Sequence, residues 1–350
     1  MNSIFPIRLK QARVMKCLSM DALCERTGNA LSKQSISKYE SGKMMPDSKS
    51  LIALANALGV AVDYFFRPLT VSIENIEFRK KTRLNAKQIA SIKEIVKDKV
   101  ERYIEIETIN GLAPEFGWSY SNILVQDEND VYTIAARIKN EWGLGEDGIN
   151  NLIEILEENN IKVVEIDAPK SFDGLSGFIN EKNPIVVLNK NFDVERKRFT
   201  ALHELGHLLL KFDNAVDEKQ IEMYCNLFAN EMLLSRNVFV QKIGQKRHDI
   251  SLQELKDIQR QFGISIDALM YKAKMLNVIT ETRFQTFHKK KNALPTFKQS
   301  VEKSRSKDEC SSRFIRLVYR ALASEIISIS KASVLLDCSV DKVRNQLNLV

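Results

Sequence analysis

The chain has 350 residues, of which 44% are hydrophobic and 28% charged, so it is long enough for two or three globular domains. No apolar run approaches the roughly 20 residues of a membrane-spanning helix, and the N-terminus lacks the basic and then apolar pattern of a secretory signal. The five scattered cysteines include no Cys-x-x-Cys pair, which argues against a disulfide framework. We therefore expect a cytoplasmic protein with reduced thiols and no membrane partner.

Charge is distributed unevenly along the chain. The net charge is +7, but residues 1–70 hold 10 Lys and Arg against 5 Asp and Glu, and residues 271–350 hold 16 against 7. The remaining 26 basic and 33 acidic residues make the middle acidic. Basic ends around an acidic centre indicate nucleic-acid contact at the ends and chemistry or protein binding in the middle.

Residues 6–66 are predicted to form four or five short helices. Ser19 and Ser32 are suited to cap the second and third helices, and Pro46-Asp47 begins a fourth. A short helix that exposes Lys, Gln and Ser at its start suits the major groove, because Gln pairs with adenine and Lys reaches guanine or phosphate. The third helix, from residue 33 to 40, has this character.

Residues 32–43, followed by Pro46 and by residues 51–64, resemble the XRE-type helix-turn-helix family. The resemblance implies contacts to double-stranded operator DNA from Lys33, Gln34, Ser35 and Lys38. It also implies that the helix is held in place by Ile36, Tyr39 and Glu40. The alternative is a helical protein-interaction module that has lost DNA binding.

A long helix is predicted after Asn85, with Gln88 placed to complete a capping box. One stripe of this helix consists of Ile89, Ile92, Val96, Val100, Tyr103 and Glu107. We interpret it as a packing or dimerisation helix, so a homodimer is one expected assembly.

Helical spacing resumes at Ile134 and again over residues 149–156, and then gives way to strands. Three β-like runs cover residues 161–166, 174–179 and 184–189. The last run directly precedes a helix, and a strand in that position can offer its edge to an extended peptide. We expect a substrate segment to lie beside residues 185–188.

That next helix carries His203 and His207, four residues apart, with Glu204 directly after the first. This spacing places both imidazoles on one helix face, where they can share a divalent metal, while Glu204 projects about 100° away. Zinc held by two imidazoles and a third protein ligand keeps one position for water, lowers its pKa toward roughly 7 and polarises a scissile carbonyl. We predict a hydrolytic zinc site with Glu204 as general base and acid. The alternative is two histidines satisfied within an apolar core helix.

Four downstream residues lie at distances compatible with a third ligand: Glu218, Glu222, Glu231 and His248. Glu222 and Glu231 are nine residues apart, about 180° around one helix, so only one of them can face the metal. His248 lies in a polar stretch and is expected to be solvated.

The order helix, strand, strand, followed by residues 196–207 and 221–234, resembles the ImmA/IrrE family of metallopeptidases over roughly residues 120–245. Members of that family are gluzincin-like enzymes that act on helix-turn-helix repressors and release DNA-damage or mobile-element genes. The resemblance implies that Glu222 is the third zinc ligand, because the family's glutamate precedes a Cys/Ala-Asn-x-Phe-Ala segment. Glu231 is then expected to be a surface group or a group behind the ligands.

The C-terminal third is predicted to be helical with one interruption. Residues 252–276 continue as helices, residues 284–307 are lysine-rich and loop-like around Pro295, and residues 313–350 return to amphipathic helices. The last segment has the pattern of a small second helix-turn-helix-like unit.

These features predict an α+β, mostly helical chain with a small sheet in a zincin-like centre. The expected segments are a five-helix helix-turn-helix domain (1–70), a helical connector (71–118), the zinc peptidase domain (119–245), a helical extension (246–283), a basic linker (284–307) and a small helical unit (308–350). The predicted function is a DNA-binding zinc endopeptidase that regulates transcription by cleaving a helix-turn-helix regulator, and that joins the nucleoid when bound to DNA. The alternatives are a transcriptional repressor or antitoxin whose zinc fold is a sensor or dimerisation module without turnover, and a peptidase with an adaptor that does not bind DNA.

Overall fold

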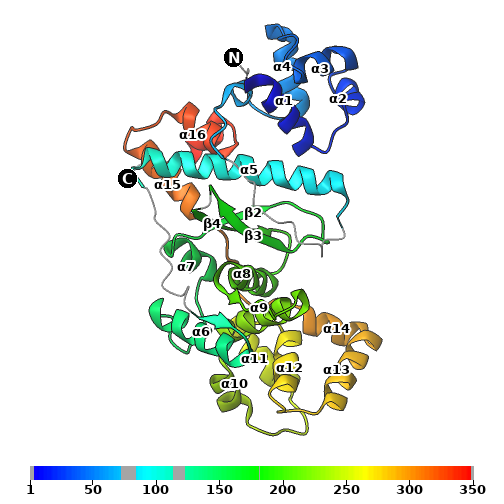
Figure 1. Cartoon of the computed structure of the whole chain (residues 1–350), viewed down its shortest axis with the longest axis vertical. Coiled ribbons are helices and arrows are strands. Elements are labelled where there is room, and N and C mark those ends of the chain that lie inside the picture. The colour runs from blue at the N-terminus through cyan, green and yellow to red at the C-terminus, as the bar shows by residue number, and fades with distance from the viewer. Residues whose placement is uncertain (1–3, 72–83, 113–122, 181, 348–350) are drawn as a thin grey trace. The chain divides into compact units, whose positions relative to one another are not determined.

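The computed structural model describes residues 4–71, 84–112, 123–180 and 182–347, and the chain divides into two compact units (Figure 1). Unit 1 combines the N-terminal region, the long helix and the residues from 312 onward, and unit 2 comprises the residues between them. The mostly helical α+β fold predicted from the sequence is confirmed. The domain boundary expected at 118/119 lies outside the described residues.

The N-terminal part of unit 1 is built from five short helical segments. They are α1 (Ile4–Met15), α2 (Met20–Arg26), α3 (Lys33–Glu40), α4 (Ser48–Leu58) and the 3-10 helix η1 (Val62–Phe66). Ser19 and Ser32 cap α2 and α3 as predicted, since each side chain accepts a hydrogen bond from a backbone N–H three residues on. The helices enclose a core that includes Phe5, Leu9, Leu23, Ile36, Leu54 and Phe65.

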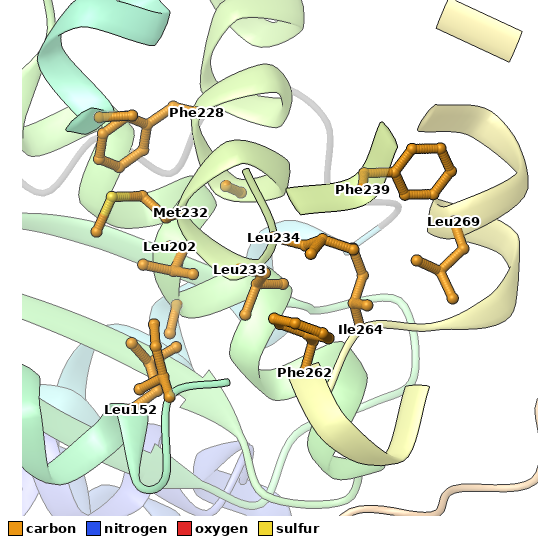
Figure 2. Packing of buried hydrophobic residues seen from close by; sticks show 14 of the residues in the cluster. Leu152, Leu202, Phe228, Met232, Leu233, Leu234, Phe239, Phe262, Ile264 and Leu269 are labelled. Carbon is orange, nitrogen blue, oxygen red and sulfur yellow. The ribbon is translucent and has the colours of Figure 1, made fainter. Parts of the chain in front are cut away.

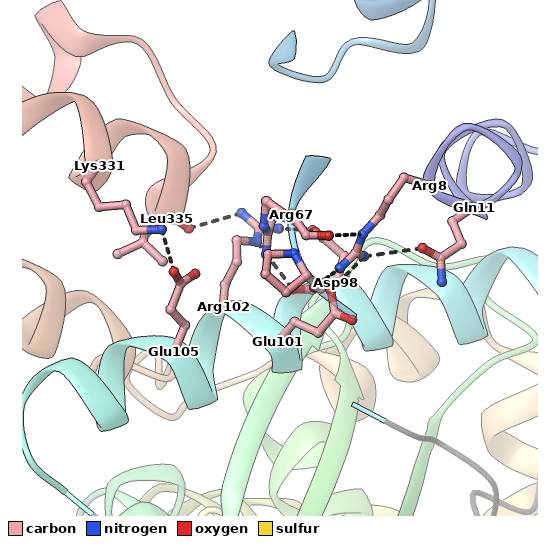
Figure 3. Close-up of polar contacts among 10 residues, drawn as sticks. Arg8, Gln11, Arg67, Asp98, Glu101, Arg102, Glu105, Lys331 and Leu335 are labelled. Carbon is pink, nitrogen blue, oxygen red and sulfur yellow. Dashed lines mark hydrogen bonds and ion pairs between the residues drawn. The ribbon is translucent and has the colours of Figure 1, made fainter. Parts of the chain in front are cut away.

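The rest of unit 1 is the long helix α5 (Ala86–Ile109) and three C-terminal helices, α15 (Arg313–Ala323), α16 (Ile329–Leu336) and α17 (Val340–Gln346). Asn85 and Gln88 form the predicted capping box. α5 packs against both α1 and α15, so its apolar stripe has partners within the chain. Figure 3 shows that α5 also carries the acidic side chains that meet Arg8 and Lys331.

Unit 2 begins with helices around two small sheets. Its elements up to the middle of the chain are β1 (Leu124–Val125), α6 (Glu128–Glu141), α7 (Leu152–Glu158), β2 (Lys162–Ile166), β3 (Gly174–Ile179), β4 (Asn183–Asn189), α8 (Val194–Leu209) and β5 (Lys211–Phe212). The helices that follow are α9 (Glu218–Leu233), α10 (Arg236–Ile243), α11 (Leu252–Phe262), α12 (Ile266–Met275), α13 (Glu281–Ala293) and α14 (Pro295–Glu302).

The larger sheet has the strand order β2-β4-β3, with β2 parallel and β3 antiparallel to β4. The expectation that residues 185–188 offer a free edge is therefore wrong. These residues lie in β4, whose backbone is paired on both sides. β3 is an edge of this sheet among the described residues, and it packs against α8.

An apolar core fixes α8 and α9 within unit 2. Figure 2 shows Leu202 from α8 close to Phe228 and Met232 from α9, all three fully buried. Phe239 of α10 and Leu269 of α12 belong to the same core. A close-packed interior of this kind holds the residues on α8 and α9 in fixed positions.

Of residues 284–307, expected to be a loop-like basic segment, 284–302 are helical except at Leu294, and 303–307 lie outside helices. Thr280 caps α13 by accepting a hydrogen bond from the Arg283 N–H, and Pro295 is at the start of α14, where its fixed φ is compatible with a helix. Phe287 is buried and its ring lies 6.0 Å from that of Phe297. Aromatic packing therefore stabilises helices in a segment whose high lysine content had indicated a loop.

Across the parts of the chain that the structure describes, no helix combines the length and the apolar character needed to cross a membrane.

Candidate metal centre

Two histidines meet on one face of α8. His203 and His207 are one turn apart, and their Nε2 atoms lie 3.1 Å from each other. Their rings are nearly perpendicular, with centroids 4.7 Å apart. His207 is 5% exposed and His203 is 16% exposed, so both imidazoles lie in a sheltered position that still opens to solvent.

Glu222 on α9 completes the cluster. Its Oε2 lies 3.4 Å from His203 Nε2 and its Oε1 lies 3.5 Å from His207 Nε2. α8 and α9 approach closely at Gly206, where an added Cβ would lie 3.3 Å from the Cα of Cys225. A glycine at this position therefore lets α9 bring its carboxylate to the histidines.

The three side chains fit a zinc ion by the chemistry of their donor atoms. One ligand atom from each residue lies within 4.8 Å of the other two, so the set can converge on a single cation. Two imidazole nitrogens and one carboxylate oxygen form a ligand set that catalytic zinc uses. The predicted ligands His203, His207 and Glu222 are thus brought together, and their assignment to zinc remains a prediction.

Cys225 orients one of these rings. Its Sγ lies 3.2 Å from His207 Nδ1, on the side of the ring opposite the cluster. A proton on Nδ1 that points at this sulfur leaves the Nε2 lone pair directed at the metal position. The Nδ1 of His203 is buried without a hydrogen-bond partner among the described residues.

Glu204 is held beside the cluster by β3. The Ser176 hydroxyl donates a 2.7 Å hydrogen bond to Glu204 Oε2. β3 can approach α8 here because residue 174 is glycine: an added Cβ would lie 2.6 Å from the Thr200 side chain and 2.8 Å from the Val187 carbonyl oxygen. The carboxylate predicted to act as a base therefore has a fixed orientation.

The other downstream carboxylate has a structural partner. Glu231 is buried and forms a 3.0 Å ion pair with the Lys272 ammonium, so of the two expected positions, at the surface or behind the ligands, the surface position is wrong. Burial lowers the pKa of Lys272, and the charge of Glu231 opposes that effect. Glu218 and His248 are exposed and do not belong to the His203–His207–Glu222 cluster.

Several contacts at this site have no signal in the sequence. Ser176, Gly174, Gly206 and Cys225 were not predicted, because no spacing rule connects them to the histidines. Two of them lie in or near a recognised pattern: Gly206 falls between His203 and His207, and Cys225 follows Glu222 by three residues.

An apolar cavity of about 500 Å³ adjoins the cluster. Glu222 forms part of its wall, together with Phe199 of α8 and Met223 of α9. Tyr271 and Met275 of α12 also line the cavity.

In unit 1, the predicted DNA-contacting residues lie on α3 with different degrees of exposure. Lys33, Gln34 and Lys38 are exposed, while Ser35 is half-buried and its hydroxyl lies 3.0 Å from that of the capping Ser32. Ile36 and Tyr39 are buried. The Glu40 carboxylate accepts two hydrogen bonds from Arg13, at 2.6 and 2.8 Å. The expected holding roles of these residues are confirmed, whereas contact with DNA stays a prediction.

Comparisons with known proteins match the N-terminal region and the middle of the chain to two different domain families. Residues 9–65 match a helix-turn-helix domain family, and residues 156–274 match the IrrE N-terminal-like domain family of peptidases. Over 64 residues, 18% of its length, the chain is 38% identical to YonR of Bacillus subtilis (strain 168), an SPβ prophage-derived uncharacterized HTH-type transcriptional regulator. The match spans 57% of that regulator.

Proposed function

We propose that this chain, which carries a helix-turn-helix domain at its N-terminus and an IrrE N-terminal-like peptidase domain in its middle, is a DNA-binding zinc endopeptidase. It would act in the cytoplasm and regulate transcription by cleaving a helix-turn-helix repressor or a similar regulatory protein. The observation that carries the proposal is the position of Glu204, oriented by Ser176 beside the His203–His207–Glu222 cluster. A purely structural zinc site needs ligands but has no use for an oriented base.

The roles of the residues follow from the donor atoms that they present. His203 and His207 would hold the ion through Nε2, and Glu222 through a carboxylate oxygen. A bound zinc ion supplies polarisation of the scissile carbonyl and a lowered pKa for the attacking water. Glu204 would act as general base and acid, taking a proton at one carboxylate oxygen and giving it to the amide nitrogen that leaves. The hydroxyl of Ser176, which donates to Oε2, would fix the carboxylate and leave its other oxygen for the reacting groups.

The surroundings of the cluster favour an extended peptide as substrate. A peptide could add to the outer edge of β3, the strand that carries Ser176, and backbone pairing of this kind tolerates many sequences. The cavity beside Glu222 would take a large apolar side chain of that peptide, since Phe199, Met223 and Met275 line it.

Exchange of Glu204 for glutamine tests turnover. Glu204→Gln keeps the size of the side chain but cannot accept a proton, so cleavage should fall by about 100-fold or more while zinc and DNA binding persist. Candidate helix-turn-helix repressors would be co-expressed with wild type, with Glu204→Gln and with Glu218→Gln, and analysed by intact mass. The exposed Glu218 is the control and should leave cleavage unchanged.

The competing function is a repressor or antitoxin whose zinc fold is a sensor without turnover. It would be favoured if wild type and Glu204→Gln left every candidate repressor intact, both under DNA damage and at rest. Equal cleavage by the two forms would instead eliminate Glu204 as the base.

DNA binding is proposed to rest on α3. The ion pair between Lys33 and Asp21 is 2.8 Å long, but both side chains are more than 60% exposed, so the pair is weak and Lys33 can exchange it for DNA. Lys33→Ala combined with Gln34→Ala should reduce sequence preference more than total affinity, because base contacts specify and phosphate contacts position. Fluorescence anisotropy with operator and random duplexes measures both quantities. If this double variant discriminated between the two duplexes as well as wild type does, α3 would not be the recognition helix.

A further inference from the structure

Residues 313–347 form a small three-helix unit that the proposed function leaves unused. The buried residues of this unit include Leu317, Val318, Ala321, Ala332, Leu335 and Val343, which form one cluster with Ile106 of α5. Polar contacts tie the same unit to α5: Arg102 donates a 3.1 Å hydrogen bond to the Leu335 carbonyl oxygen, and Lys331 pairs with Glu105 (Figure 3). A core of this size needs such support to be stable.

The connection between α16 and α17 has the length that is typical of the turn in a DNA-binding helix-turn-helix. α16 ends at Leu336 and α17 begins at Val340, so three residues join them. Asp337 adopts the left-handed conformation with φ 54°, which glycine usually supplies in such turns. Ser339 caps α17 by accepting a hydrogen bond from the Lys342 N–H. The connection between α2 and α3 is longer, with six residues.

The two helix pairs bury side chains at the same positions. α2 and α16 both begin after a capping serine, and the fourth residue of each, Leu23 in α2 and Ala332 in α16, is fully buried. The fourth residue of α3 is Ile36 and the fourth residue of α17 is Val343, and both are also fully buried. α17 therefore buries the same position of its first turn as α3 does.

The exposed side chains of α17 include types that can read DNA. They are Lys342, Arg344, Asn345 and Gln346, and the Oε1 of Gln346 accepts a 2.7 Å hydrogen bond from the Tyr319 hydroxyl. Arg recognises guanine, and Asn and Gln recognise adenine in the major groove. Residues 312–347 hold six Lys and Arg against three Asp and Glu. Arg344 lies 3.4 Å from Asp341, but both are exposed, so this pair holds Arg344 only weakly.

We propose that residues 313–347 are a second DNA-binding helix-turn-helix with α17 as its recognition helix. One chain would then read two separate blocks of sequence on double-stranded DNA, one through α3 and one through α17. The inference goes beyond the proposed function, which assigns DNA contact to α3 and leaves residues 313–347 without a role.

Selection of DNA by the full-length protein tests this assignment. Duplexes with a random 40-base-pair core would be selected with wild type, with Lys33→Ala/Gln34→Ala, with Lys342→Ala/Arg344→Ala and with Lys246→Ala/Lys298→Ala. The last pair removes two exposed lysines from unit 2 and is the charge-matched control. Wild type and control should enrich two sequence blocks, and the two remaining variants should each lose a different block.

Affinity measurements on the wild-type-selected duplex give the size of the effect. Lys342→Ala/Arg344→Ala should bind it about tenfold or more weakly, with a salt dependence reduced by about two counterions. Asn345→Ala keeps the charge and should weaken binding to the selected duplex but not to a random duplex. Loss of the α3 block alone in the Lys33→Ala/Gln34→Ala variant shows that the two assignments stand separately.

Three results would overturn the proposal. They are a single enriched block with wild type, retention of both blocks by the α17 variant, and an Asn345→Ala variant that binds the selected duplex as wild type does. The first two would leave the exposed face of α17 to a protein partner. Circular dichroism of each variant checks that the helices are retained, and Asn345→Ala, which alters neither core nor cap, decides the matter if the double variant unfolds.

Discussion

Carboxylates are used in opposite ways by α5 in unit 1 and by α8 and α9 in unit 2. On α5, Asp98 lies 3.1 Å from a nitrogen of Arg67 and 2.5 Å from a nitrogen of Arg102. Glu101 forms a 2.7 Å ion pair with Arg8, and both side chains are almost fully buried, at 2% and 1% exposure (Figure 3). The chain itself supplies the cations for these groups.

Around His203 the carboxylates instead meet imidazole nitrogens and a hydroxyl group. Glu222 faces two imidazole nitrogens, and Glu204 accepts a hydrogen bond from the Ser176 hydroxyl. α9 contains both types of environment, because Glu231 meets the Lys272 ammonium of α12, whereas Glu222 meets the histidines. A buried carboxylate with a built-in cation makes the fold sensitive to the loss of either partner, while one that faces ligand-type nitrogens is suited to bind a metal ion.

The largest expected effect is on the stability of unit 1. Glu101→Gln leaves the Arg8 guanidinium buried without a counter-charge, which costs about 3–5 kcal/mol. Glu105→Gln on the same helix is the matched control, since Glu105 and Lys331 are about one-third exposed and such pairs contribute about 0–1 kcal/mol. Hydrogen exchange of the α1 and α5 peptides, followed by mass spectrometry, measures the difference. Equal protection in both variants would contradict a structural role for the buried pair.

The next effect separates Glu222 from Glu231 on α9. Glu222→Gln should lower zinc affinity by about 100-fold or more, because it removes one of three ligand atoms. Glu231→Gln should leave zinc affinity unchanged but lower stability, since the Lys272 ammonium loses its buried counter-charge. Competition with a chelating dye gives the affinities, and thermal unfolding gives the stabilities. Equal zinc affinity in the two variants would show that Glu222 is not a ligand.

The sequence is informative where a contact depends on local spacing. The serine caps of α2 and α3 and the capping box of α5 were predictable, because each joins residues three positions apart. The same holds for the pairing of His203 with His207 on one helix turn. Glu222 could be selected from its rivals only through a family resemblance, since its distance from the histidines depends on how α8 and α9 pack.

Contacts that depend on sheet order and packing could not be predicted from spacing. β4 is central because β2 pairs with it in parallel and β3 in antiparallel orientation, and local alternation does not encode that order. Ser176 reaches Glu204 only through this arrangement. Similarly, the packing of Phe287 on Phe297 makes helices of a lysine-rich segment that composition alone assigns to a loop.

The smallest predicted effect concerns the orientation of Glu204. Ser176→Ala removes the 2.7 Å hydrogen bond to Oε2 but leaves the three ligand side chains and the base in place. The cleavage rate should fall about tenfold or somewhat more, since a hydrogen bond to a charged group contributes about 1.5–3 kcal/mol and this one is only part-buried. Zinc affinity should not change. Ser176→Thr retains a hydroxyl at this position and should restore most of the rate, which a merely structural role of Ser176 would not require.

Ser171→Ala, on an exposed residue that precedes β3, is the control. A Thr variant as slow as the Ala variant, or a parallel loss of zinc, would mean that Ser176 supports the sheet and does not orient the base.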